Sequence, residues 1–370
     1  MNILLVTMSM DIGGAETHIL ELAKELKKRG NNVYVVSAGG KLISELNCFG
    51  IEHIYAPLKD KKINHICTSF KIIKNIIKKK DIHIVHAHAR IPGAICGIIC
   101  KKAKVPFVTT VHGIYRVNAI LKLLSNWGDK TLAVSEDIKK QVIRDYKLEE
   151  ENVKTTVNGI DTNKFKKKKN LKEKLKEEFN IEKEYTVVMH VSRLDKDSSR
   201  VAQMLIDLAQ KLEKEKIRVV IIGSGDKYEE LKKVADTKNA IMLGARTDVN
   251  EILNMADIFV GVSRAALEAM STEIPVILAG NEAYKQGYQG IFDENKLEKA
   301  LETNFCCRQM SKVEEEILYE DILKLKNNEE RINIGKYNRE CVQKYYSLEK
   351  MADDCMNLYN ETIEMRKNKN

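Results

Sequence analysis

The sequence is poor in the residues that mark fibrous, linker-rich and disulfide-bonded proteins. Its 370 residues include only four prolines and nineteen glycines, which excludes a collagen-like chain and a chain dominated by flexible linkers. The eight cysteines form no CxxC pair and do not follow the ligand spacing of a zinc site. The adjacent Cys306 and Cys307 would chelate a metal poorly. We therefore expect reduced, mostly buried thiols in a cytoplasmic protein.

Long apolar runs are also missing. No stretch reaches the roughly eighteen consecutive apolar residues that a membrane-spanning helix needs. The opening MNILLVTM has neither the basic segment nor the long apolar core of a signal peptide. These absences predict a cytoplasmic protein whose contact with the inner face of the cell membrane is at most peripheral.

Positive charge is present in moderate excess, with 62 basic and 53 acidic side chains and a net charge of +9. Most lysines are expected on solvated faces, although a phosphate-bearing ligand or an anionic membrane would also suit them. The helix expected over Ser69–Lys80 joins a basic face to an isoleucine-rich face. That pattern fits either a helix on anionic lipid or an ordinary helix with a basic outer face. No nucleic-acid partner is expected, because no basic stripe interleaves with aromatic residues.

Short apolar strands alternate with amphipathic helices along the whole chain. Ile3–Thr7 has the continuous apolar character of a buried parallel strand, and Glu16–Arg29 follows it with helical spacing of its apolar residues. A second series starts with the strand Thr186–Val191 and the helix Ser199–Glu213. The rhythm predicts an α/β protein with doubly wound parallel sheets, in which the loops after the strands gather at one edge.

The two series are expected to form two domains, over residues 1–163 and 164–344. The lysine-rich stretch Thr162–Asn170 shows no strand or helix period and is the expected linker. The last segment is mainly helical, and we expect residues 345–370 to return to the first domain.

Glycines follow the first strand. Gly13 and Gly14 allow the backbone to approach a ligand closely, and the helix that begins beside Glu16 presents free N–H groups suited to phosphate. The spacing is not GxGxxG, so the dinucleotide fingerprint is absent. A purely structural turn remains an equal alternative for this loop.

Histidines end two other predicted strands. His86 and His88 alternate along one strand, which invites a metal-binding interpretation. No carboxylate or third histidine lies nearby in the sequence, so no metal site is expected and core packing is favoured for these two. His112 is the better functional candidate, because Gly113 beside it leaves room for a ligand.

The second series carries charged and small residues at its strand ends. Arg193 and Lys196 lie three apart at a strand-to-helix turn, where they could clamp a diphosphate or simply be surface charges. The turns at Gly223 and Arg246 would let a base and ribose lie along the backbone. Glu268 follows small apolar residues near a helix start and could accept hydrogen bonds from two ribose hydroxyls.

Taken together, these segments resemble glycosyltransferase family 4, the retaining enzymes of the GT-B fold. The resemblance rests on the order and spacing of GGAE at 13–16, HG at 112–113, AVSE at 133–136, NGID at 158–161, VSRLDK at 191–196, GSGD at 223–226, LGARTDV at 243–249, LEAM at 267–270 and PVI at 275–277. It implies two Rossmann-like domains facing a central cleft and a metal-independent, retaining transfer from a nucleotide sugar, taken to be a UDP-sugar. No cofactor is implied, because the nucleotide sugar is a co-substrate.

The resemblance also implies roles for individual residues. The catalytic group would be His112, Arg193 and Lys196. The donor would be bound by Gly14, Gly223, Arg246, Ser263, Arg264, Ala265, Leu267 and Glu268. The acceptor side, for a glycan, lipid-linked or small-molecule acceptor, would include Gly13, Glu16 and His88.

The sequence departs from the family pattern in two places. The family usually has a second glutamate eight residues before the one at Glu268, and that position is Val260 here. After Lys196, where the family commonly has glycine, the chain continues Asp197-Ser198-Ser199. These departures leave two alternatives open: a nucleotide-sugar-binding partner with weak catalysis, and a UDP-sugar epimerase, against which the missing carboxylate counts.

Overall fold

The computed structural model describes residues 1–114 and 117–369, and the chain divides into two compact units. Unit 1 comprises Met1–Gly159 and Leu348–Asn370, and unit 2 comprises Ile160–Ser347. The boundaries predicted at 163/164 and 344/345 lie three or four residues from this division. Within the described ranges, no helix combines the length and the apolar character needed to cross a membrane.

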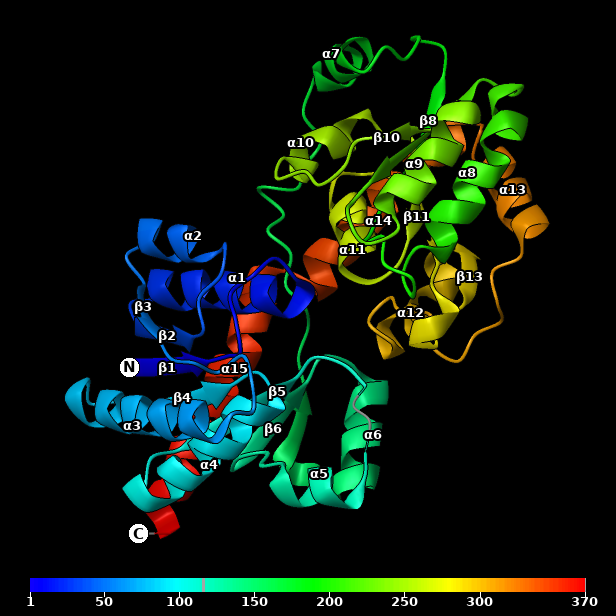
Figure 1. The fold of residues 1–370 in the computed structure, drawn as a ribbon. Helices are drawn as coiled ribbons and strands as arrows, with labels where there is room; N and C mark the ends of the chain where they lie inside the picture. The colour runs from blue at the N-terminus through cyan, green and yellow to red at the C-terminus, as the bar shows by residue number, and fades with distance from the viewer. Residues whose placement is uncertain (115–116, 370) are drawn as a thin grey trace. The chain divides into compact units, whose positions relative to one another are not determined.

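Unit 1 is built on seven short strands: β1 (Asn2–Val6), β2 (Asn32–Ser37), β3 (Glu52–Tyr55), β4 (Ile84–Ala87), β5 (Phe107–Val111), β6 (Lys130–Ala133) and β7 (Val153–Thr155). They form one parallel sheet in the order β3-β2-β1-β4-β5-β6-β7 (Figure 1). The winding direction reverses between β1 and β4. In doubly wound sheets ligands bind at the carboxyl ends of the strands that flank such a reversal.

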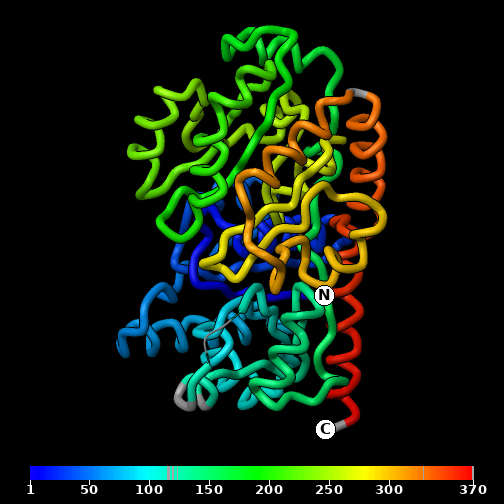
Figure 2. Tube along the Cα trace, turned by 90° about the vertical axis from the view of Figure 1, so that its right-hand side faces the viewer, coloured from blue at the N-terminus to red at the C-terminus, as the bar shows by residue number. Residues whose placement is uncertain are grey.

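Helices pack on both faces of this sheet. They are α1 (Gly14–Lys28), α2 (Ile43–Cys48), α3 (Ile63–Lys79), α4 (Arg90–Ala103), α5 (Ala119–Leu124), α6 (Glu136–Tyr146) and α15 (Leu348–Lys369), with a 3-10 turn η1 (Glu150–Asn152). Side chains of β1 alternate between two cores: Ile3 and Leu5 pack with α1 and α15, whereas Leu4 and Val6 pack with α3 and α4. Figure 2 shows α15, in red, beside the elements of unit 1. The predicted return of the C-terminal helix to the first domain is thus confirmed.

Unit 2 contains a second sheet, made of β8 (Thr186–Val191), β9 (Ile217–Ile222), β10 (Ile241–Met242), β11 (Ile258–Gly261), β12 (Val276–Ala279) and β13 (Tyr288–Ile291). The strand order is β10-β9-β8-β11-β12-β13, and its reversal lies between β8 and β11. The expectation of a wholly parallel sheet is wrong at one edge, because β13 pairs antiparallel with β12. The connection between them holds only the short turn η3 (Glu282–Tyr284), which is too short for the crossover that a parallel pair requires.

The helices of unit 2 are α7 (Leu171–Glu178), α8 (Arg200–Glu213), α9 (Tyr228–Thr237), α10 (Val249–Ile252), α11 (Ser263–Ser271), α12 (Leu297–Glu302), α13 (Glu315–Lys324) and α14 (Asn328–Tyr345), with turns η2 (Leu253–Met255) and η4 (Glu294–Lys296). One apolar core joins α8, α9 and α13 to the sheet. Its buried residues include Leu205 and Leu208 on α8 and Ile322 on α13. The core holds the strand ends, and therefore the loops after them, in fixed positions.

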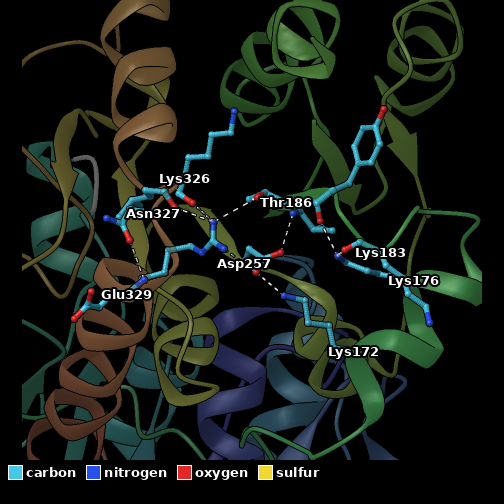
Figure 3. Close-up of polar contacts among 12 residues, drawn as sticks. Lys172, Lys176, Lys183, Thr186, Asp257, Lys326, Asn327 and Glu329 are labelled. Carbon is cyan, nitrogen blue, oxygen red and sulfur yellow. Dashed lines mark hydrogen bonds and ion pairs between the residues drawn. The ribbon is translucent and has the colours of Figure 1, made fainter. Parts of the chain in front are cut away.

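The lysine-rich stretch Thr162–Asn170, predicted as a linker, lies within unit 2 and leads into helix α7. Asp257, just before β11, accepts hydrogen bonds from Lys172 Nζ and from the backbone N–H of Val187 at the start of the sheet. Lys176 is buried, and its ammonium donates to the carbonyls of Lys183 and Tyr185 at 2.8 and 2.6 Å (Figure 3). Burial lowers the pKa of Lys176. Through these contacts Lys172 and Lys176 hold α7 against the residues that precede β8 and β11.

The packing of helix α3 decides whether its isoleucine-rich face contacts lipid or belongs to the core. Ile73, Ile76 and Ile77 are buried in the core of unit 1 and are unavailable to lipid. The lysines Lys71 and Lys74 are exposed on the opposite side. The helix is therefore an ordinary element of the fold with a basic outer face, and lipid contact through its apolar face is ruled out.

Candidate functional site

The turn between β1 and α1 combines open space with a helix N-terminus. Gly13 precedes the helix in an extended conformation, and a Cβ added there would lie 2.4 Å from Oε2 of Glu16. Gly14 is the first helical residue, and a Cβ on it would meet nothing within 4 Å. The backbone at Gly14 is thus accessible to a ligand, whereas the backbone at Gly13 is covered by the flexible side chain of Glu16, whose carboxylate folds back over it.

Three imidazoles meet at the carboxyl edge of the unit 1 sheet, and we call them the histidine trio: His18 on α1, His88 just after β4 and His112 just after β5. His88 Nδ1 and His112 Nε2 are hydrogen-bonded at 3.1 Å, and the two rings are stacked. The ring centroids of His18 and His112 are 4.8 Å apart. The fourth histidine of this region, His86, packs beneath His88 with ring centroids 4.1 Å apart.

His86 is a satisfied core histidine, as favoured from the sequence. Its Nδ1 is hydrogen-bonded to the hydroxyl of Tyr359 on α15 at 2.6 Å, and its Nε2 to Thr110 Oγ1 at 2.7 Å. Burial lowers the pKa of His86 to about 3. His88 and His112 also have lowered pKa values, His112 to about 4, because burial penalises the charged ring. These rings are therefore neutral at physiological pH.

Unit 2 has a cavity of about 260 Å³ at the point where its strand order reverses, and we call it the unit 2 cavity. It lies at the carboxyl ends of β8, β11 and β12. Its lining is hydroxyl, amide, imidazole and guanidinium, with a few small apolar groups: His190, Val191, Ser192, Arg193, Ser198, Val262, Ser263, Arg264, Ala265, Ala279, Asn281, Tyr284 and Gln286. None of these described lining residues is acidic. Such a lining suits a ligand that carries negative charge.

Local backbone geometry shapes this cavity. Ser263, the first residue of α11, has a positive φ of 58°, and its N–H donates to the carbonyl of Phe305. The turn from β11 into α11 is consequently very tight, and the start of the helix points at the ligand space. His190 is buried beside it, with Nδ1 hydrogen-bonded to the Val260 carbonyl at 2.7 Å and Nε2 to Ser192 Oγ at 2.8 Å.

The predicted phosphate-binding residues lie on the loop that follows β8. Arg193 lines the unit 2 cavity, its side chain is 74% exposed, and its nearest carboxylate is that of Asp195 at 4.0 Å. Lys196 is also exposed but is not among the described lining residues. Gly223 faces the same loop, and a Cβ on it would lie 1.9 Å from the Ser192 carbonyl oxygen. Gly223 therefore has a packing reason to be glycine, whatever its contact with a ligand.

The remaining predicted donor residues lie on or near α11. Glu268 is largely buried, and its Oε1 accepts a hydrogen bond from Arg264 Nε at 2.9 Å. Ala265, between them, lines the unit 2 cavity, whereas the side chain of Leu267 is wholly buried in the core and only its backbone could reach a ligand. Arg246 is held in a two-pronged contact with the carboxylate of Asp248, at 2.9 and 2.6 Å.

Val260 gives a different explanation for the missing second glutamate. Its side chain is fully buried inside β11, in the main core of unit 2. A carboxylate at this position would point into apolar packing and could not reach a ligand. The interpretation of Val260 as a site position that lost its carboxylate is therefore wrong. The tight β11–α11 turn leaves only Val262 between strand and helix, so it offers little room for a second acidic residue.

Several residues of these sites were not found from the sequence. His18 was overlooked because it sits 70 positions before His88, and only the adjacency of β1 and β4 brings them together. Asn158 was recognised only as part of the NGID motif at 158–161, and its contact with His18, at 3.2 Å between Oδ1 and Nδ1, was not predicted. Asn281, Tyr284 and Gln286 come from the irregular β12–β13 connection. The available signal was position near the end of a predicted strand for His190 and position after a predicted strand for Asn281.

Comparison with known proteins identifies two matching family models. Residues 12–164 match Glycosyltransferase Family 4, and residues 185–305 match Glycosyl transferases group 1. The first match lies in unit 1 apart from its last five residues, and the second lies within unit 2.

Individual relatives match over nearly the whole chain at low identity. N-acetyl-alpha-D-glucosaminyl L-malate synthase of Bacillus anthracis is 21% identical over 98% of both chains. Alpha-monoglucosyldiacylglycerol synthase of Streptococcus pneumoniae is 24% identical over 73% of this chain and 68% of its own length.

Solved structures share the fold. A glycosyltransferase from Rickettsia africae matches with a TM-score of 0.80 at 21% identity and 98% coverage of both chains. Anabaena HepE, solved in complex with UDP, matches with a TM-score of 0.76 at 16% identity over 98% of this chain and all of its own. The two Rossmann-like units are therefore those of the GT-B fold.

Proposed function

The chain belongs to glycosyltransferase family 4, and on that basis we propose that it transfers a sugar from a UDP-sugar to a glycan, lipid-linked or small-molecule acceptor, with retention of the anomeric configuration and without a metal. The unit 2 cavity is the observation that carries this proposal. It lies at the reversal point of a doubly wound sheet, beside the N-terminus of α11, with two guanidinium groups and no acidic residue among its described lining. A nucleoside diphosphate has the charge that this arrangement favours.

By the family resemblance, each unit would contribute donor-binding residues. Arg193 and Lys196 neutralise the diphosphate, and Glu268 accepts hydrogen bonds from the ribose hydroxyls. Arg264, which lines the unit 2 cavity, donates a hydrogen bond from Nε to Glu268 Oε1 and so restrains that carboxylate. In unit 1, Gly14 offers backbone N–H to the donor phosphate, and His112 contacts the transferred sugar.

Other residues take supporting parts in this proposal. Gly223 and Arg246 border the base and ribose, and Ser263, Ala265 and the backbone of Leu267 form the start of α11 around the phosphates. Gly13, Glu16 and His88, the last a member of the histidine trio, take the acceptor side.

The proposed reaction breaks the bond between the anomeric carbon and the diphosphate oxygen and forms one to an acceptor hydroxyl oxygen on the same face. The acceptor proton passes to the departing diphosphate. Arg193 and Lys196 stabilise the charge that develops on that leaving group, which lowers the barrier because the charge is larger in the transition state than in the bound donor. The neutral imidazole of His112 can hydrogen-bond a sugar hydroxyl without adding a repulsive positive charge to an oxocarbenium-like centre.

The names of two relatives suggest the class of acceptor and, through it, the cellular location of the reaction. Alpha-monoglucosyldiacylglycerol synthase is named for a glycolipid. UDP-Gal:alpha-D-GlcNAc-diphosphoundecaprenol alpha-1,3-galactosyltransferase of Escherichia coli, which is 26% identical over 58% of this chain, is named for a sugar linked to undecaprenol. We propose an acceptor of this kind, met at the cytoplasmic face of the membrane. The exposed lysines of α3 are the proposed contact with anionic headgroups.

A transfer assay tests the proposed activity. The purified chain is supplied with a panel of radiolabelled nucleotide sugars and a lipid or glycan acceptor extract, and labelled product and released nucleotide are both measured. Lys196→Ala and Glu268→Ala are expected to lower turnover by about 100-fold or more, because each removes a charge-assisted contact to the donor. Lys232→Ala, an exposed lysine on α9, is the matched control and should retain full activity.

The same assay separates the two alternatives. UDP binding without turnover of any donor would instead indicate a binding partner with weak catalysis. Interconversion of a UDP-sugar without an acceptor would indicate an epimerase, which the absence of acidic groups among the described cavity residues disfavours. Full activity in both Lys196→Ala and Glu268→Ala would show that the donor site is wrongly placed.

A further inference from the structure

The histidine trio has the composition of a transition-metal site. One ring nitrogen from each of His18, His88 and His112 lies within 4.8 Å of the corresponding nitrogens of the other two. A tetrahedral zinc ion with bonds near 2.0–2.1 Å needs ligand nitrogens about 3.4 Å apart. The hydrogen-bonded pair His88 and His112, at 3.1 Å, is already near that spacing. A side-chain rotation that moves the ring nitrogen of His18 by little more than about 1 Å would place all three nitrogens at corners of a tetrahedron.

The hydrogen bonds around the trio leave lone pairs available. Oδ1 of Asn158 can only accept, so Nδ1 of His18 carries the proton toward it and Nε2 keeps the lone pair. A bond between two imidazoles likewise requires one bare nitrogen, on either His88 or His112. Nε2 of His88 is buried and has no hydrogen-bond partner within the described ranges, so it can carry the ring proton while Nδ1 binds the metal. The contact of His18 with Asn158 is also the kind of outer-shell bond that orients metal-bound histidines.

The chemistry of the trio selects the class of ion. Three imidazoles with no carboxylate suit Zn²⁺, Co²⁺, Ni²⁺ or Cu²⁺, whereas Mg²⁺ and Ca²⁺ prefer oxygen ligands. His18 and His88 are buried, while His112 is half-buried, so a fourth coordination position would face outward from the cluster.

We propose that His18, His88 and His112 together bind one borderline-soft divalent cation of the Zn²⁺ class, and that this cation inhibits sugar transfer. The inhibition rests on the proposed function, because His112 would be held by the cation instead of contacting the transferred sugar. The proposed binding of the cation does not depend on the proposed function. Transfer itself needs no metal, so chelator should leave the rate unchanged or raise it.

Cobalt titration tests the binding directly. The full chain, with the exposed Cys48 and Cys67 changed to serine to remove competing thiols, is stripped with chelator and titrated with Co²⁺. We expect visible absorption bands of four-coordinate Co²⁺ that saturate at one equivalent and are displaced by Zn²⁺ but not by Mg²⁺. His18→Gln should lose at least about tenfold in affinity, and the half-buried His65→Gln, outside the trio, should match the parent protein.

Two further variants keep the test decisive if His18→Gln fails to fold. Asn158→Ala should weaken Co²⁺ binding by about 10- to 100-fold, and Asn158→Asp should strengthen it, because a carboxylate makes the His18 ring a better ligand. Absence of Co²⁺ bands at millimolar metal, or equal affinity in the parent, His18→Gln and Asn158→Ala, would overturn the site. Binding without inhibition of transfer would retain the site and refute the proposed role of His112.

Discussion

The two units share a plan of strands and helices, but their carboxyl edges are built from different groups. In unit 1 the edge is formed by imidazole rings that bond to one another, with His86 and His88 in contact at 4.1 Å between ring centroids. In unit 2 the edge is a cavity into which Arg193 and Arg264 bring positive charge. Unit 1 thus presents neutral hydrogen-bonding groups, and unit 2 presents cations.

The difference follows from burial. Burial lowers the pKa values of His86, His88 and His112 at the edge of unit 1, that of His86 to about 3. The guanidinium of Arg193 is mostly exposed and keeps its charge at little cost. A charged diphosphate is therefore best matched by unit 2, and the uncharged hydroxyls of a sugar or acceptor by unit 1.

The largest expected effect comes from a carboxylate placed inside β11, and its comparison is a carboxylate placed in the turn between β11 and α11. Val260→Glu should destabilise unit 2 by on the order of 4 kcal/mol or more, because it buries a charge in apolar packing. Val262→Glu should cost much less, since Val262 is half-buried and lines the unit 2 cavity. Urea unfolding of the two variants measures the difference. Equal stability would mean that Val260 does not belong to the core.

The pH dependence of stability tests whether burial in unit 2 also keeps an imidazole ring, that of His190, neutral. Burial lowers the pKa of His190 from 6.5 to about 4, although its bond to the Val260 carbonyl acts in the opposite direction. Between these pH values the unfolded chain binds a proton that the folded chain does not, so stability falls as pH drops from about 6.5 to about 4, by up to about 3 kcal/mol.

His190→Asn is the matched variant for this pH dependence. Asparagine keeps an N–H donor for the Val260 carbonyl but does not titrate, so its unfolding free energy should depend less steeply on pH over that window. Denaturant unfolding at several pH values compares the two slopes. The assignment fails if the slopes coincide.

A smaller effect is expected for the hydrogen bond that links α15 to the unit 1 sheet. Tyr359→Phe removes the hydroxyl from Nδ1 of His86 and should cost about 2 kcal/mol, because a buried polar atom loses its partner. Tyr55→Phe, at a side chain that is 62% exposed, should change stability very little. Equal unfolding midpoints in urea would show that the link does not stabilise unit 1.

The smallest change in stability is expected on the outer face of α3. Replacing its four exposed lysines, Lys71, Lys74, Lys78 and Lys79, by glutamine should alter unfolding free energy by only about 0.5 kcal/mol. The same variant should lose flotation with anionic liposomes at low salt, which the parent protein should show and high salt should abolish. Failure of the parent protein to float at low salt refutes the membrane contact.

Much of the architecture could be predicted from local pattern, because each buried strand is a short apolar run followed by a polar turn. The first strand and helix were placed within two residues at every end. Helix α7 was not predicted, because six lysines between positions 166 and 174 made the segment look like a solvated linker. In the structure Lys176 is instead buried, with its ammonium bonded to backbone carbonyls. The antiparallel β13 was missed because its connection carries no helical pattern.

The candidate site was predicted less completely, and the reason is distance along the chain. Arg193 was predicted because it lies in the turn after a strand, where strand ends converge at the sheet edge, and Arg264 because of the family resemblance; both line the unit 2 cavity. The grouping of His18 with His88 depends on which strands are neighbours, which one sequence does not reveal. Val260 was misassigned because counting residues from Glu268 cannot distinguish a loop position from one inside a strand.

The central claim is that unit 2 holds the nucleotide part of a UDP-sugar, with Glu268 on the ribose. Calorimetric titration of the chain with UDP tests it most directly. The account predicts one UDP bound per chain, about 100-fold weaker binding by Glu268→Ala, and unchanged binding by Glu229→Ala on the exposed face of α9. UDP binding that is equally tight in Glu268→Ala, or no binding by the parent protein at millimolar UDP, would contradict it.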